Sequence, residues 1–465
     1  MTETTSAASI HKVRRLGLGG KRGPGWEYQK QGRRVRRADP RRVRLGRIDP
    51  TLSAAAGLVP FNAFMRDLGL GRRVARLFNR LKSPRGLVYP MGAQLQLLID
   101  VAAAGEDRVF GVECLAADPV VQHLAGGAIP SVDTVYRDLR RFGNEDVEAL
   151  EVVMAEHGIA PVPAGPGHVH LDIDTTVEPL FGSQEGALPG PNPRYHGRPS
   201  YHPVLGVVAE TGTCIGACLR PGDTGFGEAD VAVVARWLGR IRQHVGRKKL
   251  MTVRMDAAAD CAAFLQALDA AGCRFIIKLR VTEAVIGTLL MHQSWRTVDV
   301  DADGKPTCQV ATLTFQRDSW LAIGGGFRVV AVRRNDRQSG NQLRLWDDND
   351  LSTQLYVTSD WLAPEEEIAD EYNGRAEVEP IIGDLKHAFG LGKVPSQDFN
   401  ANHAAFMIKL LTHNLLRRYA RRAAAKISHW RTPWLRRLLI LRPGRLLRSG
   451  RRWTLRLAPS LLQLE

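Results

Sequence analysis

The sequence has no long apolar segment. An uninterrupted apolar run of about 18 residues, which a membrane-spanning helix requires, is absent from its 465 residues. The best candidate segments are broken by Asp100, Arg236 and Lys409. The first ten residues, Met1 to Ile10, also lack the apolar core of a secretory signal. We therefore expect a cytoplasmic protein without a membrane partner.

Cysteine is scarce and scattered. Of six cysteines, only Cys214 and Cys218 lie close together, and neither a second pair nor a matching histidine pair accompanies them. A zinc site is therefore not expected. The cytosol keeps thiols reduced, so we expect buried free thiols at all six positions, which are Cys114, Cys214, Cys218, Cys261, Cys273 and Cys308.

Acidic residues are scarce at both ends. The net charge is +16, yet residues 1–50 alone carry 14 basic and 4 acidic residues, and residues 401–465 carry 15 basic and 1 acidic. The middle of the chain is therefore acidic, with a net charge of −8. This distribution of charge suits a protein whose two basic ends bind a polyanion while carboxylates in its middle part have another role.

The pattern of apolar residues changes twice along the chain. Residues 51–160 have helical periodicity, as in Pro90 to Ala104, and the Arg-bearing segment that Ser131 opens is either part of a helix-turn-helix or a plain packing helix. Strand-like segments such as HVHLDID, LMTVRMD and CRFIIKLRV then alternate with helices, which predicts a mixed α/β sheet.

These patterns divide the chain into six regions. We predict a flexible basic arm, for which a solvated tail without a partner is the alternative, and a helical DNA-binding module. A mixed-sheet core follows, with a β-rich insertion before its last helix, and then a basic helical C-terminus. The boundaries are 1–50, 51–160, 161–281 (core, first part), 282–360 (insertion), 361–400 (core, last helix) and 401–465.

Three carboxylates follow predicted strands. Asp172 and Asp174 lie at the end of one strand, and Asp256 ends another. Neighbouring strand ends can meet at one edge of a sheet, although an acid at a strand end is also common as a turn former. A further acid lies in DEYNGRAEVEPIIGDLK, where helical geometry places four polar side chains on one narrow face. They are Tyr372, Arg375, Glu379 and Lys386. Pro380 follows Glu379, so we expect a kink there that leaves Lys386 less securely on this face.

The spacing of these four residues resembles the Y-x2-R-x3-E-x6-K signature of the DDE transposases of the IS-four superfamily. LDIDTT and VRMDAAAD resemble the strands that carry its two aspartates, and the β-rich block lies where the superfamily has its insertion. GLVYPMGAQLQLLIDVAAAGEDR, IPSVDTVYRDLRRF and KVPSQDFNANHAAFMIKLLTHNLL are similar to the IS-thirteen-eighty group, so the resemblance covers about residues 50–420.

The resemblance implies an RNase H-like core in which Asp174, Asp256 and Glu379 are the catalytic residues and bind two Mg²⁺ ions, with Mn²⁺ as a substitute. Asp174 is preferred to Asp172 because the family motif places a hydroxyl residue directly after the acid. Asp172 stays an alternative, since it shares the same strand face.

The other members of the signature are assigned to DNA. By the resemblance, Tyr372, Arg375 and Lys386 hold DNA phosphates beside the metals. Trp320 or Trp346 in the insertion either stacks a flipped base or is a packed core residue. A polar cluster between the first two strands either touches DNA or is an ordinary loop. Its members are Tyr195, His196, Arg198 and Tyr201.

The expected function is therefore that of a nucleoid-associated DNA transposase from a bacterial insertion sequence. It would bind terminal inverted repeats, act as a metal-dependent endonuclease and join the cut ends to target DNA, as a homodimer in the synaptic complex. A metal-dependent nuclease on the same core and a DNA-binding protein without catalysis are the alternatives.

Overall fold

The computed structural model describes residues 39–85, 87–190, 192, 196–324, 326–335 and 351–459. Most of the predicted basic arm (residues 1–38), Tyr195 and Trp346 lie outside the described residues. The chain divides into two compact units, one of Met1–Val132 with Tyr419–Glu465 and the other of Asp133–Arg418. Within the described part of the chain, no helix is long and apolar enough to cross a membrane.

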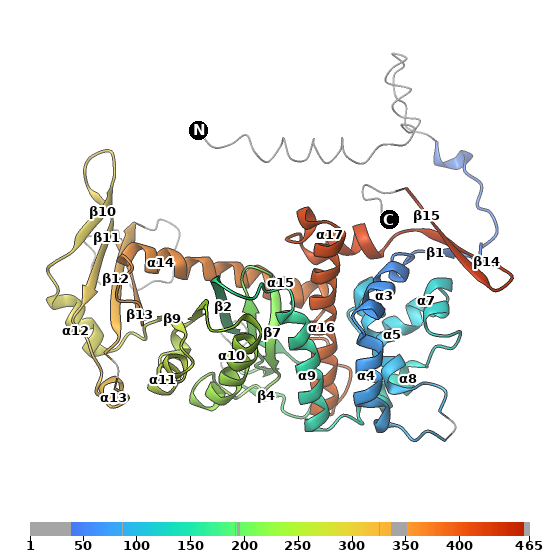
Figure 1. Ribbon diagram of the computed structural model, residues 1–465, viewed down its shortest axis with the longest axis horizontal. Helices are drawn as coiled ribbons and strands as arrows, with labels where there is room; N and C mark the ends of the chain where they lie inside the picture. Colours follow the sequence, from blue (N-terminus) through green and yellow to red (C-terminus); the bar gives the residue numbers. More distant parts are fainter. Residues whose placement is uncertain are drawn as a thin grey trace, which may run out of the picture. The chain divides into compact units, whose positions relative to one another are not determined.

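The first unit combines short helices from the N-terminal region with the end of the chain (Figure 1). The helix expected over Pro90 to Ala104 is α5, which is buried along almost its whole length. The N-terminal elements are η1 (Pro40–Arg42), β1 (Leu52–Ser53), α3 (Leu58–Asp67), α4 (Leu70–Phe78), η2 (Asn79–Leu81), α5 (Met91–Ala104), α6 (Gly111–Leu115) and α7 (Pro119–Leu124).

Two contacts hold α5 in this unit. Gly92 permits the close approach of α4, because a Cβ atom there would lie 2.7 Å from the Cα atom of Ala75. At the other end, Arg436 donates to the carbonyls of Ala102 (2.7 Å) and Ala103 (3.2 Å), in the last turn of α5, where carbonyls are not bonded by the regular helical pattern. The C-terminal region therefore stabilises the N-terminal helices.

The helical prediction for the C-terminal region is wrong beyond residue 443. The helix α16 (Phe399–Ala423) does form where it was expected. After η6 (Ala425–Ile427), α17 (Thr432–Leu435) and the π-helix η7 (Arg436–Ile440), however, the chain makes a hairpin of β14 (Gly444–Ser449) and β15 (Arg452–Leu457), and β14 also pairs with β1. Pro443 ends the helical segment, and Gly450, with a φ of +59°, makes the tight turn.

The second unit is built on a nine-stranded sheet. Its order is β10-β11-β12-β13-β9-β8-β2-β6-β7, with β2, β8 and β9 parallel to one another and the other pairs antiparallel. Its strands are β2 (Gly167–Thr175), β6 (Val204–Val208), β7 (Thr213–Cys218), β8 (Lys249–Met255), β9 (Arg274–Lys278), β10 (Arg296–Val300), β11 (Pro306–Leu313), β12 (Arg328–Asn335) and β13 (Leu351–Thr358).

The two faces of this sheet differ. Val169, Leu171 and Ile173 of β2 point into a large apolar core that includes α10 (Val231–Val245) and α11 (Ala262–Ala270). The opposite face of β9, β11 and β12 lies under α14 (Glu365–Asn373), which is drawn in orange in Figure 1. Under α14 this second face holds a smaller apolar cluster that includes Ile276, Val310 and Val330, whereas at β2 the same face carries polar groups.

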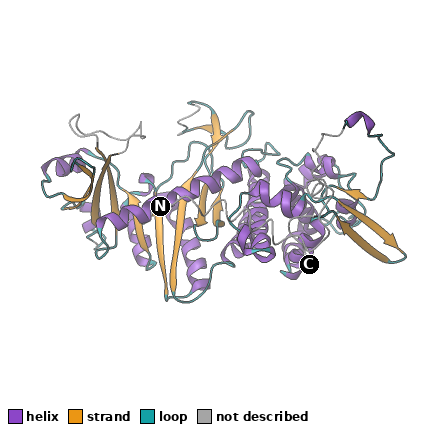
Figure 2. Ribbon diagram, turned by 90° about the horizontal axis from the view of Figure 1, so that it is seen from above, coloured by secondary structure: helices purple, strands orange, loops and turns teal. Residues whose placement is uncertain are grey.

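The predicted β-rich insertion is joined to the main sheet. β13 pairs with β9, so β10 to β13 extend the core sheet, as the long row of strands in Figure 2 illustrates. The segment also contains α12 (Glu283–Met291) and α13 (Asp318–Leu321). Trp320 is fully buried and packs edge-on against Phe315 and Phe327, as the packed-core interpretation expected.

The remaining elements of this unit are short or peripheral. They are α8 (Val132–Leu139), which begins at the unit boundary, α9 (Asn144–Ile159), the small sheet of β3 (Glu178–Pro179), β5 (Pro199–Tyr201) and β4 (Leu188–Pro189), the 3-10 turns η3 (Glu228–Asp230), η4 (Ala257–Ala259) and η5 (Gly374–Glu377), and α15 (Val378–Ala388).

The six thiols are free, as expected, but they are not all buried. Cys214, Cys273 and Cys308 are buried, and burial raises the pKa of Cys214 to about 12. Cys114 is exposed, because it lies on the short helix α6 that covers little of the unit's core.

A buried amide joins α16 to β7 and α9. Asn414 accepts a 2.8 Å hydrogen bond from the amide of Cys214 and donates to the carbonyls of Cys214 (2.8 Å) and Met154 (3.0 Å). Gly158 allows this approach, since a Cβ atom there would lie 1.8 Å from the Cys214 oxygen. Through Asn414, α16 is therefore fastened to β7 and α9 within the second unit.

Asn414→Ala is expected to lower the free energy of unfolding by about 3 kcal/mol, because it leaves the buried backbone groups that Asn414 binds without hydrogen-bond partners. Urea unfolding followed by circular dichroism measures the change. The matched control is Asn144→Ala, at an exposed position of α9 with the same residue type, which should shift stability by about 0.5 kcal/mol or less. Equal effects of the two substitutions would contradict the role of Asn414.

Candidate active site

Four polar side chains alternate along β2. His168, His170, Asp172 and Asp174 are two residues apart, so they share one face of the sheet while the residues between them enter the apolar core. The parallel neighbour β8 pairs Asp172 with Arg254 and ends just before Asp256. The segment that carries Tyr372 and Arg375 lies over this polar face, since Arg254 binds the Glu371 carbonyl and Arg375 pairs with Asp174.

Asp172 forms a buried ion pair. Arg254 donates two hydrogen bonds to its carboxylate, from Nε (2.6 Å) and Nη2 (2.9 Å), and both side chains are almost completely buried. Burial raises the pKa of Asp172, while Arg254 opposes that shift. The third nitrogen of Arg254 donates to the carbonyl of Glu371 at 2.6 Å. Arg254 therefore connects β2, β8 and α14.

Asp174 lies nearer to solvent and has a different partner. Arg375 Nη2 is 2.8 Å from its Oδ1 atom. Burial raises the pKa of Asp174; the Arg375 charge lowers it and the Asp256 charge raises it again. The Asp256 side chain accepts a 3.0 Å bond from the amide of Ala258, which fixes it at the start of η4. The charge of Asp256 thus acts on Asp174 near the ends of β2 and β8.

The prediction of one continuous helix from Tyr372 to Lys386 is wrong. α14 ends at Asn373, the 3-10 turn η5 follows, and α15 begins at Val378. Arg254 binds the Glu371 carbonyl, which an uninterrupted helix would offer to the amide four residues later. A Cβ atom on Gly374 would lie 2.6 Å from Arg254 Nη1, so glycine gives the guanidinium room at the break.

The expected kink at Pro380 is also wrong. Pro380 is the third residue of α15, where a backbone N–H has no partner within the helix to lose. The helix is interrupted before this proline, at η5.

The four residues of the signature have separate environments. Tyr372 is buried, its ring centroid lies 4.8 Å from that of Tyr356 with the two rings tilted, and burial raises its pKa to about 12. Glu379 is exposed in the first turn of α15. Lys386 donates to the carbonyl of Val177 (2.9 Å) and lies 3.4 Å from Glu178. Lys386 therefore reaches the segment that follows β2.

Asp174, Asp256 and Glu379 do not form a compact set of ligands. Among the residues that the structure describes, the group of three whose ligand atoms all lie within 4.8 Å of one another is His168, His170 and Glu371. Asp174 and Asp256 fit a divalent cation, because such an ion would offset the repulsion that raises the pKa of Asp174. Glu379 has the right chemistry but stays at the surface.

The other polar positions named from the sequence are placed as follows. Tyr201 is fully buried and its hydroxyl donates to the carbonyl of Glu185 at 2.7 Å, which favours the ordinary-loop interpretation for this residue. Arg198 lies 4.5 Å over the ring of Phe181, and His196 is exposed.

Sequence reasoning missed Arg254 and the two histidines of β2. The signal for the histidines was present, since His-x-His-x-Asp-x-Asp places all four side chains on one sheet face. Arg254 precedes Asp256 by two residues, so the same alternation places it on that face. Its contact with Glu371 joins residues 117 positions apart and had no local signal.

Substitutions at the two β2 aspartates should differ in their effect on stability. Asp172→Ala leaves the Arg254 charge buried and unpaired, so we expect a loss of about 3–5 kcal/mol. Asp174→Ala removes the ion-pair partner of Arg375 but also relieves repulsion with Asp256, so the two effects partly cancel and we expect a loss of about 1 kcal/mol. Urea unfolding of the metal-free protein measures both. A larger loss for Asp174→Ala would contradict the assignment of Asp172 as the structural acid.

Comparisons with known proteins identify a family for the chain. The family model described as transposase DDE domain group 1 matches residues 36–463. No curated protein sequence matches the chain. Among solved structures, one similar chain is that of a piggyBac transposase synaptic complex with hairpin DNA, with 12% identity, a TM-score of 0.43 and coverage of 82% of this chain and 78% of that chain. The chain belongs to the family of DDE-domain transposases, group 1.

Proposed function

We propose that this transposase is the enzyme of a bacterial insertion sequence, which binds terminal inverted repeats, cleaves both ends and joins them to target DNA. The observation that carries the proposal is the approach of Asp174 and Asp256 near the ends of two parallel strands, where the Asp256 charge adds to burial in raising the pKa of Asp174. Such a pair of half-buried acids is what a site for divalent cations requires.

The catalytic residues that we propose are Asp174, Asp256 and Glu379. Mg²⁺, with Mn²⁺ as a substitute, would supply activation of the attacking oxygen and stabilisation of the leaving oxygen. Asp174 and Asp256 hold carboxylate oxygens at the sheet edge. Glu379, on the first turn of α15, would be the third ligand.

Arg375 and Lys386 are proposed to hold DNA phosphates. The Nε atom of Arg375 is buried without a hydrogen-bond partner in the described structure, so it has a donor to offer when the side chain turns toward a ligand. Lys386 is partly exposed beside Glu178. Tyr372 is buried, and its ring would position Arg375 through the short segment between them.

The strand order supports an RNase H-like core. Within the large sheet, β7-β6-β2-β8-β9 has three antiparallel strands on one side and two parallel additions on the other. Asp174 is the last residue but one of β2, and Asp256 directly follows β8, which are two central strands of this part.

The basic ends support DNA binding. The hairpin of β14 and β15 has no acidic residue and exposes five arginines: Arg445, Arg448, Arg451, Arg452 and Arg456. Such a surface can bind phosphates of the DNA backbone without reading sequence. A synaptic homodimer is part of the proposal, since two ends must be joined and one active site acts on one end at a time.

Asp174→Asn, Asp256→Asn and Glu379→Gln should each reduce metal-dependent cleavage of end DNA at least about a thousandfold, because each removes a proposed metal ligand. Binding of end DNA should stay within about threefold of the parent, since backbone phosphates are bound by other residues. A radiolabelled cleavage assay with a parallel gel-shift measurement checks both.

The matched control is Glu377→Gln, which alters an exposed acid two residues before Glu379. It should leave cleavage unchanged. Full activity of Glu379→Gln would exclude Glu379 as the third ligand, whereas loss of DNA binding in all three variants would favour a structural role for these acids.

Deleting residues 1–48 should weaken DNA binding and flatten its salt dependence, because fewer counterions are released when fewer cations meet phosphates. The slope of log affinity against log salt concentration, from fluorescence anisotropy, measures this. An unchanged slope would identify the arm as a tail without a DNA contact.

A further inference from the structure

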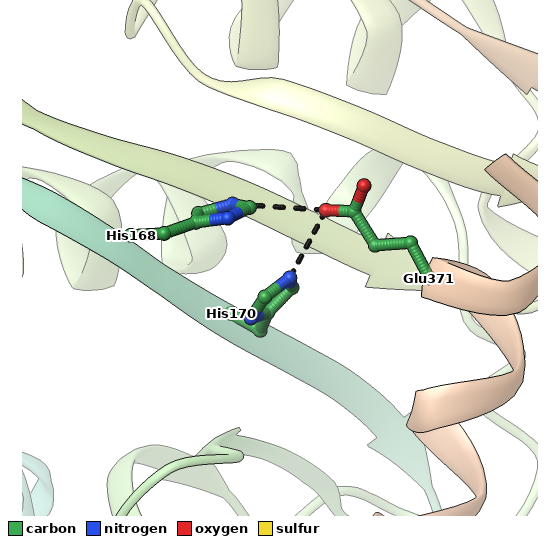
Figure 3. A group of neighbouring side chains, drawn as sticks. All are labelled: His168, His170 and Glu371. Carbon is green, nitrogen blue, oxygen red and sulfur yellow. Dashed lines mark hydrogen bonds and ion pairs between the residues drawn. The ribbon is translucent and has the colours of Figure 1, made fainter. Parts of the chain in front are cut away.

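A second cluster of ligand-type side chains lies on the same sheet face, beyond Asp172 from the proposed catalytic acids. Figure 3 shows His168 and His170 of β2 with their rings directed at the carboxylate of Glu371 on α14. His170 Nε2 lies 3.0 Å from Glu371 Oε1, and His168 Nε2 lies 3.6 Å from the same oxygen. One ligand atom from each residue therefore converges on a common point.

The spacing of these atoms suits a small transition-metal ion. Tetrahedral zinc binds nitrogen and oxygen at about 2.0–2.1 Å, which places neighbouring ligand atoms about 3.3 Å apart. The two distances to Glu371 Oε1, 3.0 Å and 3.6 Å, lie on either side of that value. Two imidazoles and one carboxylate favour zinc and related ions, whereas Mg²⁺ prefers oxygen ligands.

The three ligand residues are oriented by neighbouring side chains, as the ligands of metal sites commonly are. Glu210 accepts a 2.7 Å hydrogen bond from His170 Nδ1, which directs the opposite nitrogen, Nε2, toward Glu371. Arg274 is paired with Glu371 Oε2, so that Oε1 is the oxygen that faces the histidines. Carboxylates that orient a histidine ligand in this way raise its affinity for metal.

We propose that His168, His170 and Glu371 bind one zinc-type divalent cation, at a site separate from the acids Asp174, Asp256 and Glu379. The cysteine pattern gave no reason to expect zinc, and this site uses no cysteine. The side chains are partly accessible, with exposed fractions of 32% for His168, 21% for His170 and 17% for Glu371, so an ion can enter from solvent.

When no ion is bound, hydrogen bonds to protons on the histidines hold this cluster together. His170 lies between Glu210 and Glu371, and although burial opposes its charge, these carboxylates raise its pKa to about 9. His168 lies 2.7 Å from the Thr252 hydroxyl. A cation would replace the proton between His170 and Glu371, and binding would release it to solvent.

Such an ion would be structural. It would fasten α14 to β2 at Glu371, the residue whose carbonyl already binds Arg254 and which directly precedes Tyr372. The ion would therefore fix the start of the helical break that sets the direction of Arg375 and α15. This inference does not depend on the proposed transposase activity.

The test uses the full-length protein, stripped with EDTA and dialysed against Zn²⁺. We expect about one Zn²⁺ per chain by plasma mass spectrometry, retained in a large excess of Mg²⁺. Co²⁺ as a spectroscopic probe should give the visible absorption of a four-coordinate site. His168→Ala and His170→Ala should each weaken binding at least about a hundredfold, and Glu210→Gln about 10- to 100-fold.

Two controls separate this site from other histidines and from the catalytic acids. His292→Ala, in the β-rich segment, and Asp174→Asn should each keep one Zn²⁺ and the same Co²⁺ spectrum. Circular dichroism verifies folding, and His168→Asn offers a second variant that keeps a polar side chain beside Thr252. Absence of stoichiometric Zn²⁺ binding by the parent, or binding by either histidine variant that is as tight as the parent's, would overturn the proposal.

Discussion

The ion pair between Asp172 and Arg254 is the interaction on which the arrangement of this site depends. It lies at the centre of the polar sheet face, with His168 and His170 on one side along β2 and Asp174 on the other. Its two charges are almost wholly removed from water, which is costly unless every polar atom is matched. Arg254 meets this condition with two bonds to Asp172 and one to the Glu371 carbonyl, and so fixes both strands and the end of α14.

The same constraint explains the break in the signature segment. Because the Glu371 carbonyl is bound by a guanidinium, the helix does not continue regularly, and Gly374 leaves the space that the guanidinium needs. The segment then continues through the 3-10 turn η5 into α15. Arg375 is thereby turned to Asp174, while Lys386 reaches the chain after β2. A continuous helix with one polar face would have presented these groups in a single row.

The extent to which the sequence predicted this structure differs between local and long-range features. The strand at HVHLDID, the strand at LMTVRMD and the helix of Met91–Ala104 formed where their periodicity placed them, since burial on one face imposes that periodicity. The preference for Asp174 over Asp172 rested on the family motif and stays a prediction; in the structure Asp172 pairs with Arg254 and Asp174 with Arg375. The helical break and the continuity of the insertion with the main sheet arise from contacts between distant residues, which local patterns do not contain. The C-terminal hairpin was not predicted, because the many arginines of its two strands obscure the alternation of their side chains.

The pairing of Asp174 with Arg375 has a consequence for how a cation would enter the site. Arg375 supplies positive charge to the same oxygen that a divalent ion would bind, so the two compete for it. With Asp256 close by, a cation with two charges would gain more from this site than the single charge of arginine does. An ion held by Asp174 and Asp256 would leave Arg375, whose Nε has no hydrogen-bond partner among the described residues, to bind an anion beside it. A DNA phosphate is such an anion. Metal binding and DNA binding would then be coupled, because Arg375 would leave the Asp174 carboxylate when the metal binds and would pair with a DNA phosphate instead.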